Sequence, residues 1–395
     1  MRSGATFGAT NCKFREPAME AVGSGTETPS DRDFREIAHS GGKIIFRIVS
    51  DANGRRGYQV TFTGSRPVPM AMFAIYALPQ GIPVANLPLG GSGSPWPAPP
   101  FPGCIPVFIS SDSEGLFGHE CPRCGGYWRS RGQASVCSYC GLLGESFQFL
   151  TTAQVAYVEH YAEVLETALD SVEPGEQKEV VIDMDAIVDG GAHIPKPAFY
   201  YPGTSQQTSF TCVQCKTKND IRGRFGYCCA CGCRNNIAEL RSQIEIIRSD
   251  LNDARVAPEE SVKRIVSAFD ACCRDFVAQL ATLPMRNRRR EDLQQLLFHG
   301  IDAPSGLLKR AFDIEILRGL DADLGFLRMM FQRRHVYEHE AGVATRRYIA
   351  ESGDTAVKEG ALIRETRENA HRLQGAGFES LPILRPGFPR SFLVV

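Results

Sequence analysis

The order of apolar and polar residues gives the first part of the chain a β-type pattern. Residues 43–49 and 58–62 are short apolar-rich runs on either side of a loop that contains Asn53 and Gly54. An Asn-Gly pair between two such runs predicts a β-hairpin. A third run, 70–78, fits a strand and fits a short helix nearly as well, because so short a run has no decisive periodicity.

A proline-rich stretch at 88–106 follows and predicts an extended linker. Beyond it, the apolar pattern predicts a helix at 152–171 and a strand at 179–188. Residues 195–202 show no regular pattern and are expected to lead irregularly into the next segment.

The last third of the chain has helical periodicity. Apolar residues recur at spacings of three and four, as in Ile237, Leu240, Ile244, Ile247 and Leu251. Pro258 with two glutamates after it predicts the start of a second long helix. The pattern predicts further helices at 291–299, 304–320, 322–341 and 358–373. Together these segments indicate an all-α bundle.

The composition is that of a soluble globular protein, with 395 residues, 43% hydrophobic and 23% charged. The longest apolar run is too short to cross a bilayer, and the N-terminus lacks an apolar signal-peptide core. We therefore expect a cytoplasmic protein without membrane contact. The net charge of −1 argues against extensive coating of nucleic acid, but it permits local basic patches.

Eight cysteines form two clusters with one shared spacing, Cys-x2-Cys-x12-Cys-x2-Cys. The clusters are Cys121, Cys124, Cys137 and Cys140, and then Cys212, Cys215, Cys228 and Cys231. This spacing predicts two zinc ribbons, each holding one Zn2+ ion between two cysteine knuckles. Four thiolates leave no open coordination position, so both ions are expected to be structural. Cys229 or Cys233 could replace a ligand in the second ribbon.

Basic and aromatic residues lie between the cysteines of both ribbons. The basic residues are Arg123, Arg129, Arg131, Lys216, Lys218, Arg222 and Arg224, and the aromatic ones are Tyr127, Trp128, Tyr139, Phe225 and Tyr227. Such a mixture suits single-stranded nucleic acid, through phosphate contacts and base stacking. Alternatively, the aromatics form the small core of each ribbon and the basic groups are solvated. Ribbons also serve as docking modules for proteins.

These patterns define a multidomain α+β chain. We divide it into a mobile N-terminus (1–40), a β-rich region with a proline-rich linker (41–110), a first ribbon (111–150), a helix-and-strand connector (151–205), a second ribbon (206–235), a helical domain (236–380) and a C-terminal tail (381–395).

One position breaks the apolar stripe of the predicted helix at 322–341. Arg334 falls where the pattern calls for an apolar residue, and His339 lies roughly 140° around the helix from it. A buried guanidinium requires an anion. It could pair with a carboxylate of the bundle such as Asp313 or Glu315, or it could bind an external anion.

The stretch Arg334-His335-Val336-Tyr337-Glu338-His339 resembles the R-polar-x3-H motif of the HEPN superfamily. The resemblance extends to Gly342, Tyr348 and Ser352-Gly353-Asp354, and covers roughly residues 236–380. It implies an all-α domain, a site formed by dimerisation, and a metal-independent endoribonuclease that leaves 2′,3′-cyclic phosphate and 5′-hydroxyl ends. By the same resemblance, the setting would be prokaryotic stress response or phage defence.

The resemblance assigns chemical roles to three residues. Arg334 would bind phosphate, His339 would transfer protons, and His335 would support it, since imidazole titrates near neutral pH and a guanidinium fits phosphate oxygens. A metal site at His335 and His339 with Glu338 is the other chemical interpretation. The alternative function is a non-enzymatic zinc-ribbon adaptor that binds RNA or a protein partner and forms a homodimer through its helical domain.

Overall fold

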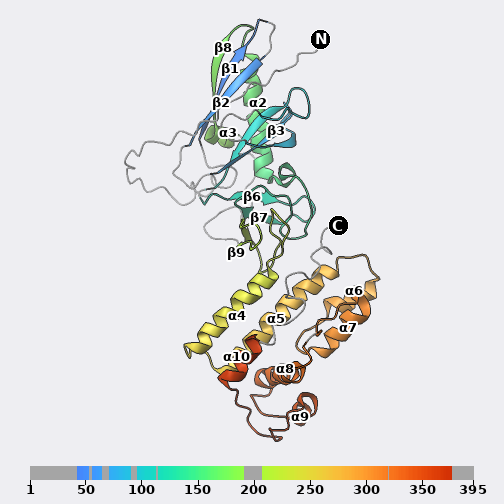
Figure 1. The fold of residues 1–395 in the computed structure, drawn as a ribbon. Coiled ribbons are helices and arrows are strands. Elements are labelled where there is room, and N and C mark those ends of the chain that lie inside the picture. The colour runs from blue at the N-terminus through green and yellow to red at the C-terminus, as the bar shows by residue number, and fades with distance from the viewer. Residues whose placement is uncertain are drawn as a thin grey trace. The chain divides into compact units, whose positions relative to one another are not determined.

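The computed structural model describes residues 42–52, 56–64, 71–89, 96–112, 114–190, 207–318 and 320–375. The chain divides into two compact units, Met1–Cys233 and Arg234–Val395 (Figure 1). The first is β-rich and contains both cysteine clusters, and the second is helical, as predicted. The predicted mobile N-terminus, the Asn-Gly turn, residues 195–202 and the C-terminal tail lie outside the described residues.

The first sheet of the β-rich unit joins strands that are distant in sequence. Strands β1 (Lys43–Ser50) and β2 (Arg56–Thr63) pair antiparallel, and β8 (Gln177–Asp183) pairs with the other edge of β1. The predicted strand at 179–188 therefore ends early. The Asp183 side chain accepts a hydrogen bond from the Ala186 backbone N–H, and helix α3 (Met184–Gly190) begins there.

The second sheet includes two strands that the sequence pattern did not predict. Strand β3 (Met72–Ala77), which resolves the strand-or-helix alternative, lies between β4 (Pro83–Leu87) and β5 (Ile105–Ser110). The proline-rich stretch connects these two strands, and its last proline, Pro106, lies inside β5. A proline is tolerated there because β5 is an edge strand among the described residues, with β3 on one side.

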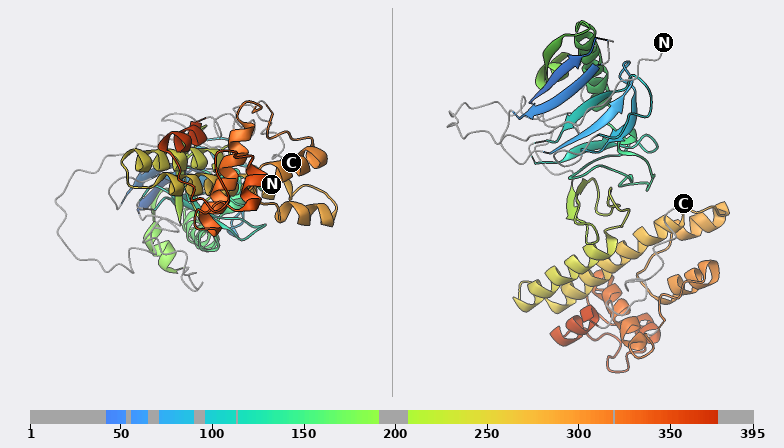
Figure 2. Two further views of the ribbon diagram at one scale, coloured as in Figure 1. Left: turned by 90° about the horizontal axis from the view of Figure 1, so that it is seen from below. Right: turned by 45° about the horizontal axis from the view of Figure 1, so that its top comes forward.

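Helix α2 (Thr152–Asp170) covers the core shared by both sheets (Figure 2). The side chain of Thr151 accepts a hydrogen bond from the Gln154 backbone N–H, and the Gln154 side chain accepts one from the Thr151 backbone N–H. The helix therefore begins with a capping box. Its buried face includes Tyr157, whose hydroxyl donates to the Phe108 carbonyl of β5 at 2.9 Å. The predicted connector thus belongs to the hydrophobic core of the β-rich unit.

The cysteine knuckles of both clusters lie beside the strands of one four-stranded sheet. Its order is β6 (Phe117–Glu120), β7 (Tyr127–Ser130), β10 (Lys218–Ile221) and β9 (Thr208–Thr211), so the two ribbons meet at the β7–β10 pair. A short 3-10 helix, η1 (Ser146–Phe149), follows the first cluster. The ribbons are therefore one folded module.

The Arg129 side chain fastens this module together. In β7 it is 4% exposed, and its Nε donates to Asp220 of β10 at 2.8 Å. Its Nη1 donates to Asp112, just after β5, also at 2.8 Å. One guanidinium therefore links both ribbons to the end of the neighbouring sheet.

The helical unit starts with two long antiparallel helices, α4 and α5, which lie side by side in Figures 1 and 2. Its helices are α4 (Asn236–Asn252), α5 (Pro258–Leu280), α6 (Asn287–Gln294), α7 (Asp302–Phe312), α8 (Leu324–His339), α9 (Arg346–Ser352) and α10 (Arg367–Gly375). The start of α5 at Pro258 agrees with the prediction. Helix α9 was not predicted. Helix α7 ends earlier than expected, at Phe312, and the next residue, Asp313, adopts a left-handed conformation.

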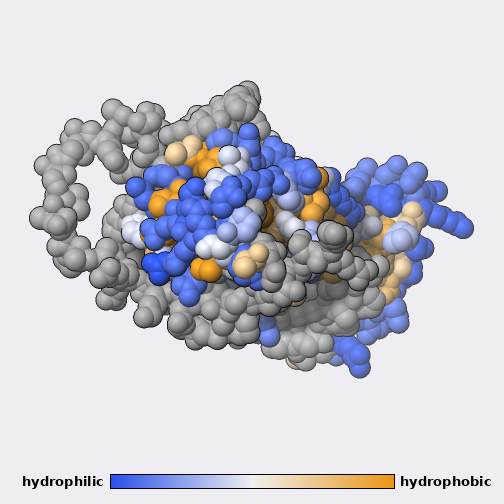
Figure 3. Space-filling model, turned by 90° about the horizontal axis from the view of Figure 1, so that it is seen from above, coloured by the Kyte–Doolittle hydropathy of each residue, from blue (hydrophilic) through white to orange (hydrophobic). Residues whose placement is uncertain are grey.

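Among the described residues, no helix is both long and apolar enough to cross a membrane. On the visible described surface in Figure 3, hydrophobic residues form small groups among hydrophilic ones. Val49 of β1 and Val181 of β8 are examples of exposed apolar side chains, at 51% and 49% exposure.

We expect Arg129→Met to lower the free energy of unfolding by about 3–5 kcal/mol, because it leaves the buried Asp112 and Asp220 carboxylates without a cation. Urea denaturation followed by tryptophan fluorescence measures this loss. Arg131→Met is the matched control, because the exposed Arg131 side chain lies two residues away. Equal stability of the two variants would contradict the role given to Arg129.

Candidate metal centres and a candidate anion site

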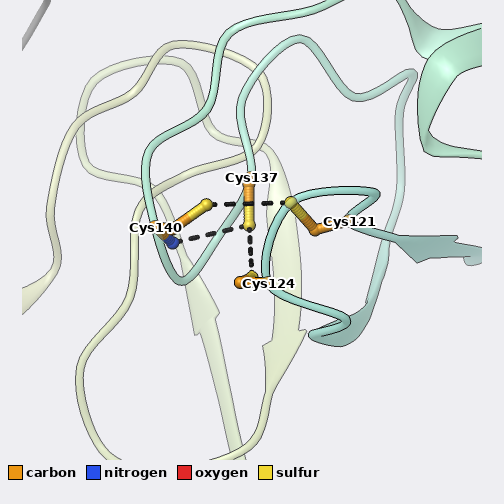
Figure 4. Close-up of side chains that lie close together, drawn as sticks. All are labelled: Cys121, Cys124, Cys137 and Cys140. Atoms are coloured by element: carbon orange, nitrogen blue, oxygen red, sulfur yellow. Dashed lines mark hydrogen bonds between the residues drawn. The ribbon is translucent and has the colours of Figure 1, made fainter.

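The four cysteines of the first cluster converge on one point. Cys121 Sγ lies 3.7 Å from Cys140 Sγ, and Cys124 Sγ lies 3.7 Å from Cys137 Sγ (Figure 4). Four thiolates around an ion at about 2.3 Å would be about 3.8 Å apart, so the spacing fits tetrahedral coordination. The Cys137 sulfur also accepts backbone N–H bonds from Tyr139 and Cys140, which would stabilise its negative charge.

The second group repeats this arrangement. Cys212 Sγ lies 3.5 Å from Cys231 Sγ, and Cys215 Sγ lies 3.4 Å from Cys228 Sγ. Asn219 of β10 reaches the Cys228 sulfur at 3.6 Å. In each group the four sulfur atoms lie within 4.8 Å of one another. Both four-cysteine groups could therefore hold a metal ion.

Each knuckle turns through a residue with positive φ, directly after its second cysteine. Gly125, Gly141 and Gly232 have φ of 64°, 69° and 71°. The fourth position is Lys216, at φ 64°. The backbone N–H of each of these residues bonds to the carbonyl of the first cysteine in its knuckle, at 2.9–3.1 Å. A common hydrogen bond thus imposes the turn, and glycine adopts it most easily.

Cys229 and Cys233 lie outside the second group. Cys229 is fully buried, and burial raises the pKa of its thiol to about 12. The Cys229 backbone carbonyl accepts bonds from Ser135 and Val136 of the first ribbon, at 2.8 and 2.9 Å. Cys229 therefore helps to join the ribbons.

The aromatic residues of the ribbons are mainly core residues. Trp128 is fully buried, Tyr127 and Tyr227 are 6% and 8% exposed, and the Tyr139 hydroxyl donates to the Tyr127 carbonyl. The base-stacking hypothesis is wrong for Tyr127, Trp128 and Tyr227, because a base cannot reach these buried rings without displacing the core. Arg129 is likewise committed to its carboxylates. Arg123 and Arg131 remain exposed.

Two adjacent arginines of α8 have opposite environments. Arg333 is buried against two carboxylates: its Nη2 donates to Asp354 at 2.9 Å, and its Nη1 donates to Glu365 at 3.0 Å. Arg334 is 8% exposed, and its Nε is buried without a hydrogen-bond partner. Among the described residues, the Arg334 guanidinium has no ion pair.

The sequence-based structural alternative for Arg334 is therefore wrong within the described residues. Glu315 pairs with Lys309, not with Arg334. The ion pairs expected for Arg334 are made by its neighbour Arg333, with partners that lie 21 and 32 residues away in sequence. Sequence reasoning missed Arg333, because the partners that decide which arginine is neutralised lie outside the helix. The one hint in the sequence was Asp354, a downstream carboxylate that could pair with an arginine of α8.

His335 directly follows Arg334 in α8, and His339 is the last residue of this helix. The rings of His335 and His339 are 4.8 Å apart, and His339 is exposed. The pKa of His335 is lowered, first by burial and then by the charges of His339 and Arg347. On the side of α5, Lys263 lies near enough for the charges of Glu338 and Arg334 to affect its pKa.

The alternative metal site at these histidines would need His335, His339 and Glu338 to gather around one ion. Within the described ranges, only the two cysteine clusters gather three or more His, Cys, Asp or Glu ligands around one point. His335, His339 and Glu338 are not such a group. What the end of α8 offers is a buried cation that has no ion pair among the described residues and is followed directly by the His335 imidazole, and this combination suits an anion.

Comparison with known proteins gave no match among protein-family models, curated proteins or solved structures.

We expect about two metal ions per chain, and we expect Cys124→Ser to weaken binding at both centres. The second centre depends on the first ribbon, because Tyr227 N–H bonds to the Ser138 carbonyl and Cys229 accepts two bonds from the first ribbon. Metal analysis after chelator challenge measures retention. Cys233→Ser is the control and should keep both ions. A Cys124→Ser protein that retains one ion as tightly as the wild type would show that the centres are independent.

We expect the His335 imidazole to titrate below the ordinary pKa of about 6.5, because burial and nearby positive charge disfavour its protonated form. NMR titration of histidine-labelled protein measures this pKa. His339→Ala should raise it by removing a like charge. Glu340→Gln should lower it further, because the Glu340 carboxylate favours the imidazolium. Shifts in the opposite directions would contradict this arrangement of charges.

Proposed function

We propose that the helical unit is a HEPN-type, metal-independent endoribonuclease whose phosphate ligand is bound by Arg334. The observation that carries the proposal is the state of that residue: its side chain is buried, at 8% exposure, and has no ion pair among the described residues. A buried cation without a partner is costly, and a phosphodiester supplies the missing negative charge. The sequence motif and the adjacent imidazoles support the same assignment.

The proposed reaction is an attack within the RNA strand. The 2′-oxygen bonds to phosphorus as a base removes its proton, and the bond from phosphorus to the 5′-oxygen breaks as that oxygen gains a proton. Arg334 stabilises the charge that grows on the phosphate oxygens. His339, exposed at the helix end, transfers protons, and His335 supports it. The products are 2′,3′-cyclic phosphate and 5′-hydroxyl ends.

A second copy of the chain would complete the site. The reaction needs both a base and an acid, and Arg334 and His339 project from different sides of α8. If the C-terminal ends of α8 from two protomers meet in a groove, each protomer supplies one exposed His339. We therefore propose a homodimer through the helical unit, which sedimentation analysis of the purified protein tests.

For the β-rich unit we propose two structural Zn2+ ions and recruitment of RNA or a protein partner. Four soft thiolates in tetrahedral spacing fit zinc, and closed four-cysteine sites leave no position for substrate. With the ribbon aromatics in the core, recruitment would use the exposed surface, which includes Arg123, Arg131 and the apolar Val213.

The test is cleavage of a mixed-sequence RNA by purified full-length protein, with and without EDTA. We expect cleavage to persist in EDTA while the ribbons stay folded, and Arg334→Ala and His339→Ala each to reduce it by about a hundredfold or more. Electrophoresis with end-group analysis identifies the cyclic phosphate.

Arg346→Ala and His371→Ala are matched controls, because Arg346 is an exposed arginine of α9 and His371 is a histidine of α10. Both should cleave RNA at the wild-type rate. Cleavage that needs an added divalent ion would contradict the metal-independent mechanism. Absence of cleavage, together with intact binding of RNA or protein, would favour the non-enzymatic adaptor.

A further inference from the structure

The carboxylates around Arg333 outnumber their cation. The side chains of Asp354 and Glu365 are 4% and 0% exposed, and both contact the Arg333 guanidinium. A third acid, Glu259 of α5, accepts the Glu365 backbone N–H at 3.1 Å. This pocket therefore carries excess negative charge, directly beside the position of Arg334 in sequence.

All three nitrogen atoms of the Arg333 guanidinium donate hydrogen bonds in this pocket. Its Nη1 contacts both Glu365 oxygens at 3.0 and 3.1 Å, its Nη2 contacts Asp354, and its Nε donates to the Tyr348 hydroxyl at 3.2 Å. The Tyr348 hydroxyl in turn donates to Asp354 at 2.6 Å. Tyr337, one helical turn after Arg333, donates to Glu365 at 3.2 Å. The pocket thus faces the side of α8 that holds residues 333 and 337.

These contacts point to competition between two neighbouring guanidiniums for the same carboxylates. A buried carboxylate that loses its cation attracts the nearest one available, and an arginine side chain is long enough to turn toward it. Arg334 is adjacent, buried and without an ion pair among the described residues. An Arg334 captured by Asp354 or Glu365 would no longer bind an external anion.

We propose that Arg333 is a positioning residue that keeps Arg334 free for phosphate by occupying Asp354 and Glu365. The inference rests on the phosphate-binding role of Arg334 proposed above. Arg333 itself does not touch the RNA. It acts by neutralising the pocket and by holding the segment from Asp354 to Glu365 against α8.

The test measures binding of a 2′-O-methyl RNA oligonucleotide, whose blocked 2′-oxygen cannot attack, by fluorescence anisotropy with the full-length protein. We expect Arg334→Met and Arg333→Met each to weaken binding by about tenfold or more. The triple variant Arg333→Met/Asp354→Asn/Glu365→Gln should restore affinity to within about threefold of wild type, because it removes the competing charges with the cation. Adding Arg334→Met to the triple variant should abolish this recovery.

A folded Arg333→Met protein with wild-type affinity would overturn the inference, as would a folded triple variant that binds as weakly as Arg333→Met. Circular dichroism and thermal unfolding establish the folded state. If Arg333→Met does not fold, the triple variant with and without Arg334 decides alone. If Arg334→Met itself binds like wild type, the phosphate assignment in the proposed function fails, which is a different result from failure of the Arg333 role alone.

Discussion

A guanidinium taken out of water needs a counter-charge, and this requirement organises both units of the protein. Arg129 meets it with Asp112 and Asp220, and in doing so joins two ribbons and a neighbouring sheet. Arg333 meets it with Asp354 and Glu365, and thereby holds the segment that follows α8 against this helix. Arg334 has no such partner among the described residues. The same physical rule thus identifies two structural arginines and one candidate for ligand binding.

The features predicted correctly from sequence depend on local geometry. A Cys-x2-Cys knuckle lies within one turn of chain, so the two four-cysteine groups could be assigned from their spacing alone. Helix α5 begins at Pro258 because the starting signal is contained in three consecutive residues. Such patterns need no knowledge of what packs against them.

The features that were missed depend on distant partners. Strand β5 carries a proline, and only its place at the edge of a sheet makes that acceptable. The sequence pattern places the two ribbons in separate domains. The pairing of Asp220 with Arg129, which joins them, connects segments about ninety residues apart and leaves no local pattern. Likewise, helical periodicity marked position 334 as unusual, but it could not show that Arg333 takes the carboxylates.

The pairing of β1 with β8 places the closure of the first sheet late in the synthesis of the chain on the ribosome. All four cysteines of the first cluster have been translated by Cys140, but β8, the second partner of β1, begins only at Gln177, and strand β10, which pairs with β7 in the ribbon sheet, comes later still. The first four-cysteine group is therefore complete in a nascent chain long before the two sheets close. A fragment cut between the two clusters would keep a metal knuckle pair but leave an open edge on β7, which invites aggregation. Recombinant work on this unit should therefore extend the expressed fragment to Cys233.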